Sequence, residues 1–80
     1  MTADYFSLTV ELDRSIMRLT LLGELDHATS WILSDFVERL DLGEATEVRV
    51  DCWGLTFLGS AGIAALVDLN AAAERVDVAV

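Results

Sequence analysis

A single serine between two glycines is the feature of this sequence that most clearly invites a chemical interpretation. Residues 59–62 read Gly-Ser-Ala-Gly, with a short apolar stretch before them and a longer one after them. Four roles suit a serine in this setting: a catalytic nucleophile, part of a phosphate-binding loop, a phosphorylation target, or the N-cap of a helix.

The nucleophile role for Ser60 has little support. The nucleophile elbow of serine hydrolases reads G-x-S-x-G, with glycine two residues before and two residues after the serine. Gly62 fits this pattern, but Leu58 occupies the earlier position and Gly59 stands one residue too late. A triad also needs a base, and His27 is the only histidine in the chain. We therefore expect a protein that is not an enzyme.

Phosphate-binding loops and metal sites have residue requirements that this chain does not meet. A Walker loop reads G-x-x-x-x-G-K-[ST], and the chain contains no lysine. Glu24 and Asp26 are close enough in sequence to share a cation, but no calcium-loop spacing surrounds them. A solvated acidic loop is the simpler interpretation, and we expect no cofactor and no metal.

The charge of the chain narrows the range of partners. Fourteen acidic residues against five arginines give a formal net charge of −9 over 80 residues. Nucleic-acid binding depends on cationic side chains that displace counterions from phosphates, so we expect neither nucleic acid nor a membrane as a partner. An acidic protein favours a partner with a basic face, and salt should then slow their association.

Hydrophobic periodicity predicts one α/β domain spanning residues 1–80, because strand-like alternation and helical spacing take turns along the chain. The N-terminus does not read as a signal peptide, and no apolar run is long enough for a transmembrane helix, so we expect a cytoplasmic protein. The predicted elements, in the order β-β-α-β-α-β, are strands 5–12 and 16–22, a helix in 28–40, a strand at 47–52, a helix in 60–75 and a strand at 76–80.

Each predicted helix has a face that should meet the core. The first helix, with Asp26 and Thr29 as candidate N-caps and Gly43 as a stop, presents Ile32, Leu33, Phe36, Val37 and Leu40. The second presents Ile63, Leu66, Val67, Asn70 and Ala71. We expect Trp31 and Trp53 to pack over the edge of the core, and the lone Cys52 to be a small buried residue at a strand end.

A helix N-cap is the role for Ser60 that agrees with every local feature, since serine is among the preferred capping residues. A cap, however, does not require Gly59 before it or the small pair Ala61 and Gly62 after it. These neighbours leave the hydroxyl accessible to another protein, and a phosphate there would meet the free N–H groups of a helix start. The sequence therefore also favours a phosphorylation target.

Two motifs at a fixed separation connect these features. GELDHAT runs from Gly23 to Thr29, and a segment of the form F-L-x-S-x-G runs from Phe57 to Gly62, with an amphipathic helix and a strand between them. With these motifs the chain resembles the anti-sigma factor antagonists of the STAS-domain family, essentially over its whole length.

The resemblance implies a bacterial partner-switching regulator of transcription, of the kind found in stress responses. Such a protein binds a serine kinase-like anti-sigma factor, is phosphorylated on the serine that opens the second helix, here Ser60, and is reset by a phosphatase. The residues implied for partner binding are Glu24, Asp26, His27, Thr29, Gly59, Ala61 and Gly62. The alternative is a scaffold or sensory module that keeps the fold and works without phosphorylation.

Two departures from the family pattern bear on this expectation. Relatives carry aspartate, two serines and glycine at the turn, whereas here Gly59 replaces the aspartate and Ala61 the second serine. Relatives also continue beyond the strand that ends at Val80 with a helix, a strand and a helix. A chain that stops there would be short for the family, and its uncovered sheet edge and apolar face would favour self-association.

Overall fold

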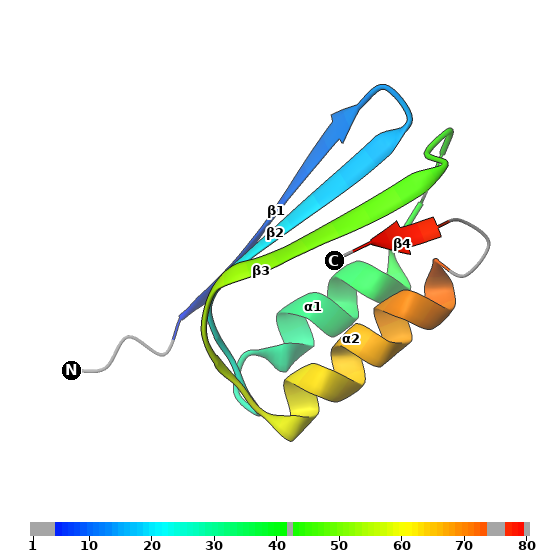
Figure 1. The fold of residues 1–80 in the computed structure, drawn as a ribbon. Helices are drawn as coiled ribbons and strands as arrows, with labels where there is room; N and C mark the ends of the chain where they lie inside the picture. Colours follow the sequence, from blue (N-terminus) through cyan, green and yellow to red (C-terminus); the bar gives the residue numbers. More distant parts are fainter. Residues whose placement is uncertain (1–4, 42, 74–76, 80) are drawn as a thin grey trace.

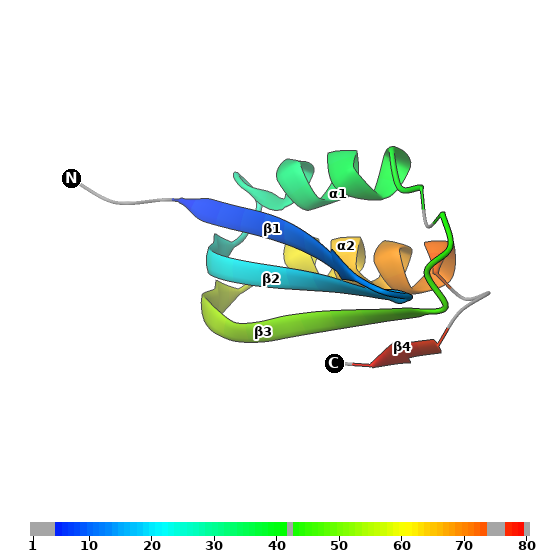
Figure 2. The same cartoon turned by 90° about the horizontal axis from the view of Figure 1, so that it is seen from above.

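A four-stranded sheet with two helices on one of its faces is the architecture of this chain (Figures 1 and 2). The computed structural model describes residues 5–41, 43–73 and 77–79, the last three as backbone only. The elements are β1 (Phe6–Asp13), β2 (Ile16–Leu25), α1 (Ser30–Glu38), β3 (Glu47–Leu58), α2 (Ser60–Ala72) and β4 (Asp77–Ala79). The predicted order β-β-α-β-α-β is confirmed, while residues 76 and 80 of the last predicted strand lie outside the described ranges.

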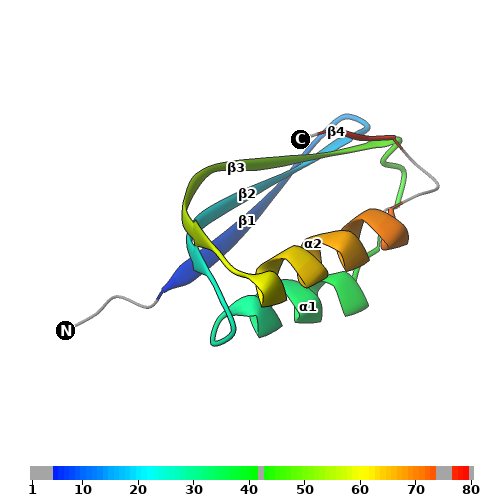
Figure 3. The same ribbon diagram turned by 60° about the horizontal axis from the view of Figure 1, so that its bottom comes forward.

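The strands lie in the order β1-β2-β3-β4. β1 and β2 form the predicted antiparallel hairpin, whose turn places Arg14 in the left-handed region at φ 59°. β2, β3 and β4 run parallel, so each helix crosses from one strand to the next over the same face. The two helices consequently start at the same end of the sheet, where β2 and β3 finish (Figure 3).

β3 is longer than the alternation in its sequence predicts. The predicted strand stops at Cys52, but pairing with β2 continues to Leu58. The pairing of β2 with β3 shifts register twice, first between Thr20 and Leu22 of β2 and again between Gly23 and Glu24. At each shift, β3 contains one residue more than β2. Each extra residue breaks the alternation of inward and outward side chains, so the period-two pattern is lost although the strand goes on.

The core lies between the sheet and the helices. Its fully buried large side chains are Leu19, Leu21, Leu25, Leu33, Leu69 and Val48. The predicted inner face of α1 is confirmed, because Leu33 is buried and Ile32, Phe36, Val37 and Leu40 pack against the core. α1 ends at Glu38, however, earlier than the predicted stop at Gly43, which lies at φ 56° in the turn that follows.

The predicted inner face of α2 is right for Leu66, which packs against the core, and wrong for its other four residues, which are exposed. Gly62, Ala65 and Leu69 are the buried residues of this helix, whereas Ile63 is 51% and Val67 60% exposed. α2 carries apolar residues all round, so hydrophobic spacing alone does not select one face. The close approach of α2 to the strand ends determines which side of the helix faces the sheet, because a Cβ on Gly62 would lie 2.7 Å from the carbonyl oxygen of Leu25.

Both tryptophans were expected at the edge of the core, and both are exposed instead. Trp53 is 95% exposed and lies within β3, beside the first register shift, where the regular alternation is interrupted. Trp31 stands on the outer side of the first turn of α1. No helix in the described part of the chain is both long and apolar enough to cross a membrane.

Candidate functional site

The two motifs of the sequence meet where the parallel strands β2 and β3 end. Glu24 pairs with Phe57 and Leu25 with Leu58, the last residues of the two strands. The N–H of Gly59 then donates to the carbonyl oxygen of Leu25 at 3.0 Å. The carboxyl ends of parallel strands are a common place for binding sites in α/β sheets. The structure thus confirms that the loop after β2 lies beside the turn before α2.

The loop before α1 is held by its own side chains. The carboxylate of Asp26 accepts from the N–H of Ala28 at 2.9 Å and from that of Thr29 at 3.0 Å. The buried Thr29 hydroxyl accepts from the N–H of Asp26 at 3.0 Å and donates to the carbonyl oxygen of Glu24. Thr29 takes the N-cap position, while the Asp26 carboxylate satisfies the N–H groups just before the helix. The start of α1 is therefore closed by hydrogen bonds.

The start of α2 is different, and it corrects the capping prediction. Gly59, with extended backbone at φ −96° and ψ −179°, is the N-cap, and Ser60 is the first residue of the helix. Because the Gly59 carbonyl already accepts from the N–H of Ile63 at 3.0 Å, the chain enters the helix one residue earlier than expected. Ser60 is exposed, and within the described ranges its hydroxyl makes no hydrogen bond.

The two glycines flanking Ser60 have different roles. A Cβ on Gly62 would lie 2.7 Å from Leu25 and 2.9 Å from Leu58, so only glycine fits between the helix and the strand ends. A Cβ on Gly59 would lie 3.1 Å from the Phe57 ring and 3.9 Å from the Cα of Asp26. Its φ of −96° suits any residue, but a Cβ there would press against the Phe57 ring, so a side chain beside Ser60 would require that ring to shift.

The predicted partner-binding residues divide by exposure. His27 is exposed, and Glu24, Asp26, Gly59 and Ala61 are half-buried at this end of the sheet. The remaining two, Thr29 and Gly62, are buried. These two hold the two segments in place, and direct contact with another protein is open to the other five.

Large apolar side chains around Ser60 were missed by the reasoning from sequence. Phe57 and Leu58 at the end of β3, and Ile63 and Val67 on α2, are all exposed. A signal for them was present: residues 53–67 contain no charged side chain, in a chain of which 24% is charged. The surface beside the serine is therefore apolar, whereas the chain as a whole is strongly acidic.

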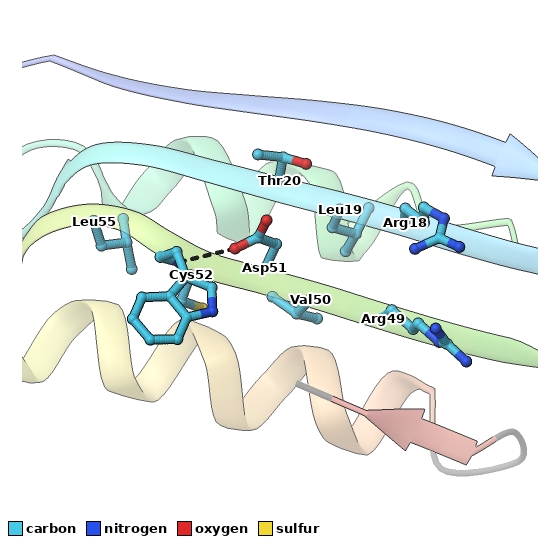
Figure 4. A pocket seen from close by; sticks show the side chains of 9 residues that line it. Arg18, Leu19, Thr20, Arg49, Val50, Asp51, Cys52 and Leu55 are labelled. Carbon is cyan, nitrogen blue, oxygen red and sulfur yellow. Dashed lines mark hydrogen bonds between the residues drawn. The ribbon is translucent and has the colours of Figure 1, made fainter.

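A hollow of about 830 Å³ lies elsewhere, along β2 and β3 (Figure 4). Its polar lining is Arg18, Thr20, Arg49 and Asp51. Arg49 pairs with Glu47, and Asp51 accepts from the N–H of Trp53 at 2.9 Å. Neither motif contributes a residue to this hollow, and its lining carries two arginines against one carboxylate.

Cys52 also lines the hollow and packs against the core. Burial, and next the charge of Asp51, raise the pKa of its thiol above the ordinary value. The prediction of a small buried residue at a strand end is wrong in both respects, because Cys52 is only half-buried and lies inside β3, although it packs against the core.

Comparison with known proteins points to one family. A family model described as "Mlab, STAS domain" matches residues 8–80. No curated protein matches the chain at a significant level.

Solved structures match over most of the chain. An anti-sigma factor antagonist from Mycobacterium paratuberculosis is 23% identical, with a TM-score of 0.75 over 94% of this chain and 62% of its own. An antisigma-factor antagonist STAS domain from Rhodobacter sphaeroides is 21% identical, with a TM-score of 0.69 over 92% of this chain and 85% of its own.

The anti-sigma factor antagonist SpoIIAA in its unphosphorylated form is 22% identical, with a TM-score of 0.67 over 92% of this chain and 67% of its own. These likenesses show the fold, and the chain spans about 62% of the length of the Mycobacterium protein. The family model covers nearly all of the sequence, and the chain therefore belongs to the STAS-domain family.

Proposed function

We propose that this chain is a cytoplasmic anti-sigma factor antagonist, a binding protein without enzymatic activity that captures a kinase-like anti-sigma factor and loses it when Ser60 is phosphorylated. Family membership and neighbours named anti-sigma factor antagonists support the general role. The observation that carries the proposal is the state of Ser60, which is exposed at the first position of α2 with a hydroxyl that the fold does not use.

The switch needs one group transfer. The kinase partner moves the γ-phosphoryl group of ATP to the Oγ of Ser60, so that a new P–O bond forms and the bond to the bridging oxygen breaks. ADP leaves, and the hydroxyl proton passes to a base of the kinase. A phosphatase then hydrolyses the phosphoester and restores the serine.

The phosphate affects the free and the bound states differently. It carries about −1.5 to −2 charges, and in the free domain it meets the N–H groups of the first turn of α2, which lack partners within the helix. In the complex, a partner pressed against Phe57, Leu58 and Ile63 would enclose the same charge in apolar surroundings. Phosphorylation therefore leaves the fold intact and weakens the complex.

Five predicted contact residues remain proposals for the partner surface: Glu24, Asp26, His27, Gly59 and Ala61. His27 is exposed, and the other four are half-buried. All five belong to the two segments that meet at the start of α2. An anti-sigma factor that phosphorylates Ser60 has to reach this end of the sheet, so the same segments serve binding and modification.

The test starts with the kinase-like protein that co-purifies with the parent chain from its native cells and is then produced recombinantly. With ATP, phosphate should appear on Ser60 in peptide mapping and be absent from Ser60→Ala. Ser30→Ala is the matched control, because Ser30 opens α1 as Ser60 opens α2, and its phosphorylation should be normal. Ser60→Glu should bind at least about tenfold more weakly, or about 1.4 kcal/mol.

A phosphorylation-independent scaffold is the second candidate, and one observation favours it. Gly59 stands where relatives carry an aspartate beside the acceptor serine, so a side chain that would help to orient the hydroxyl is missing. Binding of the anti-sigma factor without any phosphate transfer, unchanged by Ser60→Glu, would select the scaffold over the switch.

A further inference from the structure

The exposed residues of α2 are largely apolar, with Ser60, Asp68 and Asn70 as the polar ones. Its buried residues, Gly62, Ala65 and Leu69, face the sheet. At 3.6 residues per turn, the opposite side of the helix carries a row of exposed residues that we name the outer strip. The outer strip consists of Ser60, Ile63, Ala64, Val67 and Ala71.

Two side chains of the outer strip are large and exposed without any role in the core. Ile63 is 51% and Val67 60% exposed, and they are neighbours one turn apart. Phe57 and Leu58, at the end of β3, are exposed too, and the Phe57 ring lies beside Gly59, the residue before Ser60. Leu58 lies against Gly62, on the sheet side of the helix. Exposed apolar side chains that gather in one region are typical of protein interfaces.

The distribution of charge indicates what covers the outer strip. α2 contains one charged residue, Asp68, and the segment 53–67 contains none, although the chain has a net charge of −9. A second copy of the chain would bring another −9 against this surface, which disfavours self-association. A protein with an apolar ridge bordered by basic residues complements both the strip and the net negative charge of the chain.

We propose that the outer strip docks such a ridge of the anti-sigma factor, and that Val67 holds the partner independently of the state of Ser60. The identification of this partner as an anti-sigma factor rests on the proposed function. Val67 lies seven residues beyond Ser60, about 10 Å along the helix axis. A phosphate on Ser60 therefore acts on one end of the interface, while the other end keeps its apolar contact.

The test measures binding of the recombinant anti-sigma factor to Val67→Glu and to a matched control, Leu12→Glu. Leu12 is 59% exposed against 60% for Val67, and it pairs with Met17 beside the turn of the β1–β2 hairpin. Figure 1 shows this turn at the opposite end of the sheet from the start of α2. Val67→Glu should bind at least tenfold more weakly through faster dissociation, and Leu12→Glu within twofold of the parent. Val67→Ala, a change that adds no charge, should bind about threefold more weakly.

The effects of Val67→Glu and Ser60→Glu should multiply in the double variant, because the two positions are far enough apart to act independently. If the anti-sigma factor binds Val67→Glu and Val67→Ala as it binds the parent, the inference is overturned while the proposed function stands. If Val67→Glu weakens binding and Ser60→Glu does not, the switch fails and the docking strip stands.

Two further results would overturn the inference. In sedimentation of the parent, a dimer that Val67→Glu converts to monomer would show that a second copy covers the strip. Failure of the parent to bind any kinase-like anti-sigma factor would remove the proposed function together with this partner.

Discussion

The two helices cover the same face of the sheet and start at the same end, yet their outward sides differ. α1 presents charged residues to solvent, including Asp35, which pairs with Arg39 at 3.1 Å. α2 presents the apolar outer strip and forms no such pair among the residues that the structure describes. α1 has the amphipathic composition expected of a surface helix, whereas α2 resembles a helix buried on both sides. The fold therefore explains the buried side of α2, and the docking proposal assigns its outer side to a partner.

The N-terminal ends of the two helices also differ, in the hydrogen bonds that surround them. The N–H groups before α1 are satisfied by the Asp26 carboxylate, and the Thr29 hydroxyl ties the loop to β2. Neither N-cap residue makes a side-chain hydrogen bond to its helix. At α1 the backbone carbonyl oxygens of Asp26 and Thr29 accept from the N–H groups of Ser30 and Ile32, and at α2 the N–H of Ile63 donates to the Gly59 carbonyl oxygen. Under the proposed function, the N–H groups that precede Ile63 in α2 would receive a phosphate on Ser60.

The largest expected effect comes from separating α2 from the strand ends. Gly62→Val places side-chain atoms where Leu25 and Leu58 already lie, and it should lower the free energy of unfolding by about 3 kcal/mol. Ala64→Val, on the outer strip, should change it by only about 0.5 kcal/mol. Urea unfolding followed by circular dichroism measures both. Equal losses for the two variants would contradict the assignment of inner and outer sides.

A smaller effect should distinguish the two helix starts. Asp26→Ala removes an acceptor for two N–H groups and should lower the free energy of unfolding by about 1 kcal/mol. Ser60→Ala removes no hydrogen bond of the fold and should stay within about 0.5 kcal/mol of the parent. Thermal melts of both variants under one condition test this. A loss for Ser60→Ala as large as that for Asp26→Ala would mean that Ser60 does act as a cap.

The smallest effect concerns Cys52, which packs against the core that both helices cover. Because burial raises its pKa, little thiolate exists near neutral pH, and iodoacetamide should react more slowly with the folded chain than with the unfolded one. The neutral thiol contributes stability below the unfolded-state pKa, and this contribution is lost as pH rises through the folded-state pKa. Asp51→Asn, which removes the second cause, should speed alkylation slightly. Equal rates for folded and unfolded protein would contradict the raised pKa.

Much of this fold was predictable from local pattern, and the failures share a cause. The hairpin and the inner face of α1 follow from alternation and helical spacing, because apolar and polar residues there separate cleanly. α2 has no polar side to contrast with its apolar one, so its orientation depends on the fit of Gly62 against Leu25, which only the assembled structure shows.

The candidate site was predictable in position but not in detail. The resemblance to the STAS family placed the loop at Asp26 beside the turn at Ser60, and the strand register brings them together. The N-cap was misplaced by one residue because it depends on the backbone angles of Gly59, which composition does not set. The apolar surface around Ser60 was visible in the uncharged run 53–67 only once exposure was known.

The two register shifts between β2 and β3 have a mechanical consequence. Along their pairing, twelve residues of β3 run beside ten of β2, and extra residues of this kind bend and twist the strand that contains them. β3 curls toward the helices at its end, just before α2 starts (Figure 3). Removing one surplus residue, such as Thr56, would straighten the ladder and carry Ser60 away from the loop at Asp26. The location of Ser60 thus depends partly on the number of residues in β3, so a deletion can move Ser60 without changing any side chain that surrounds it.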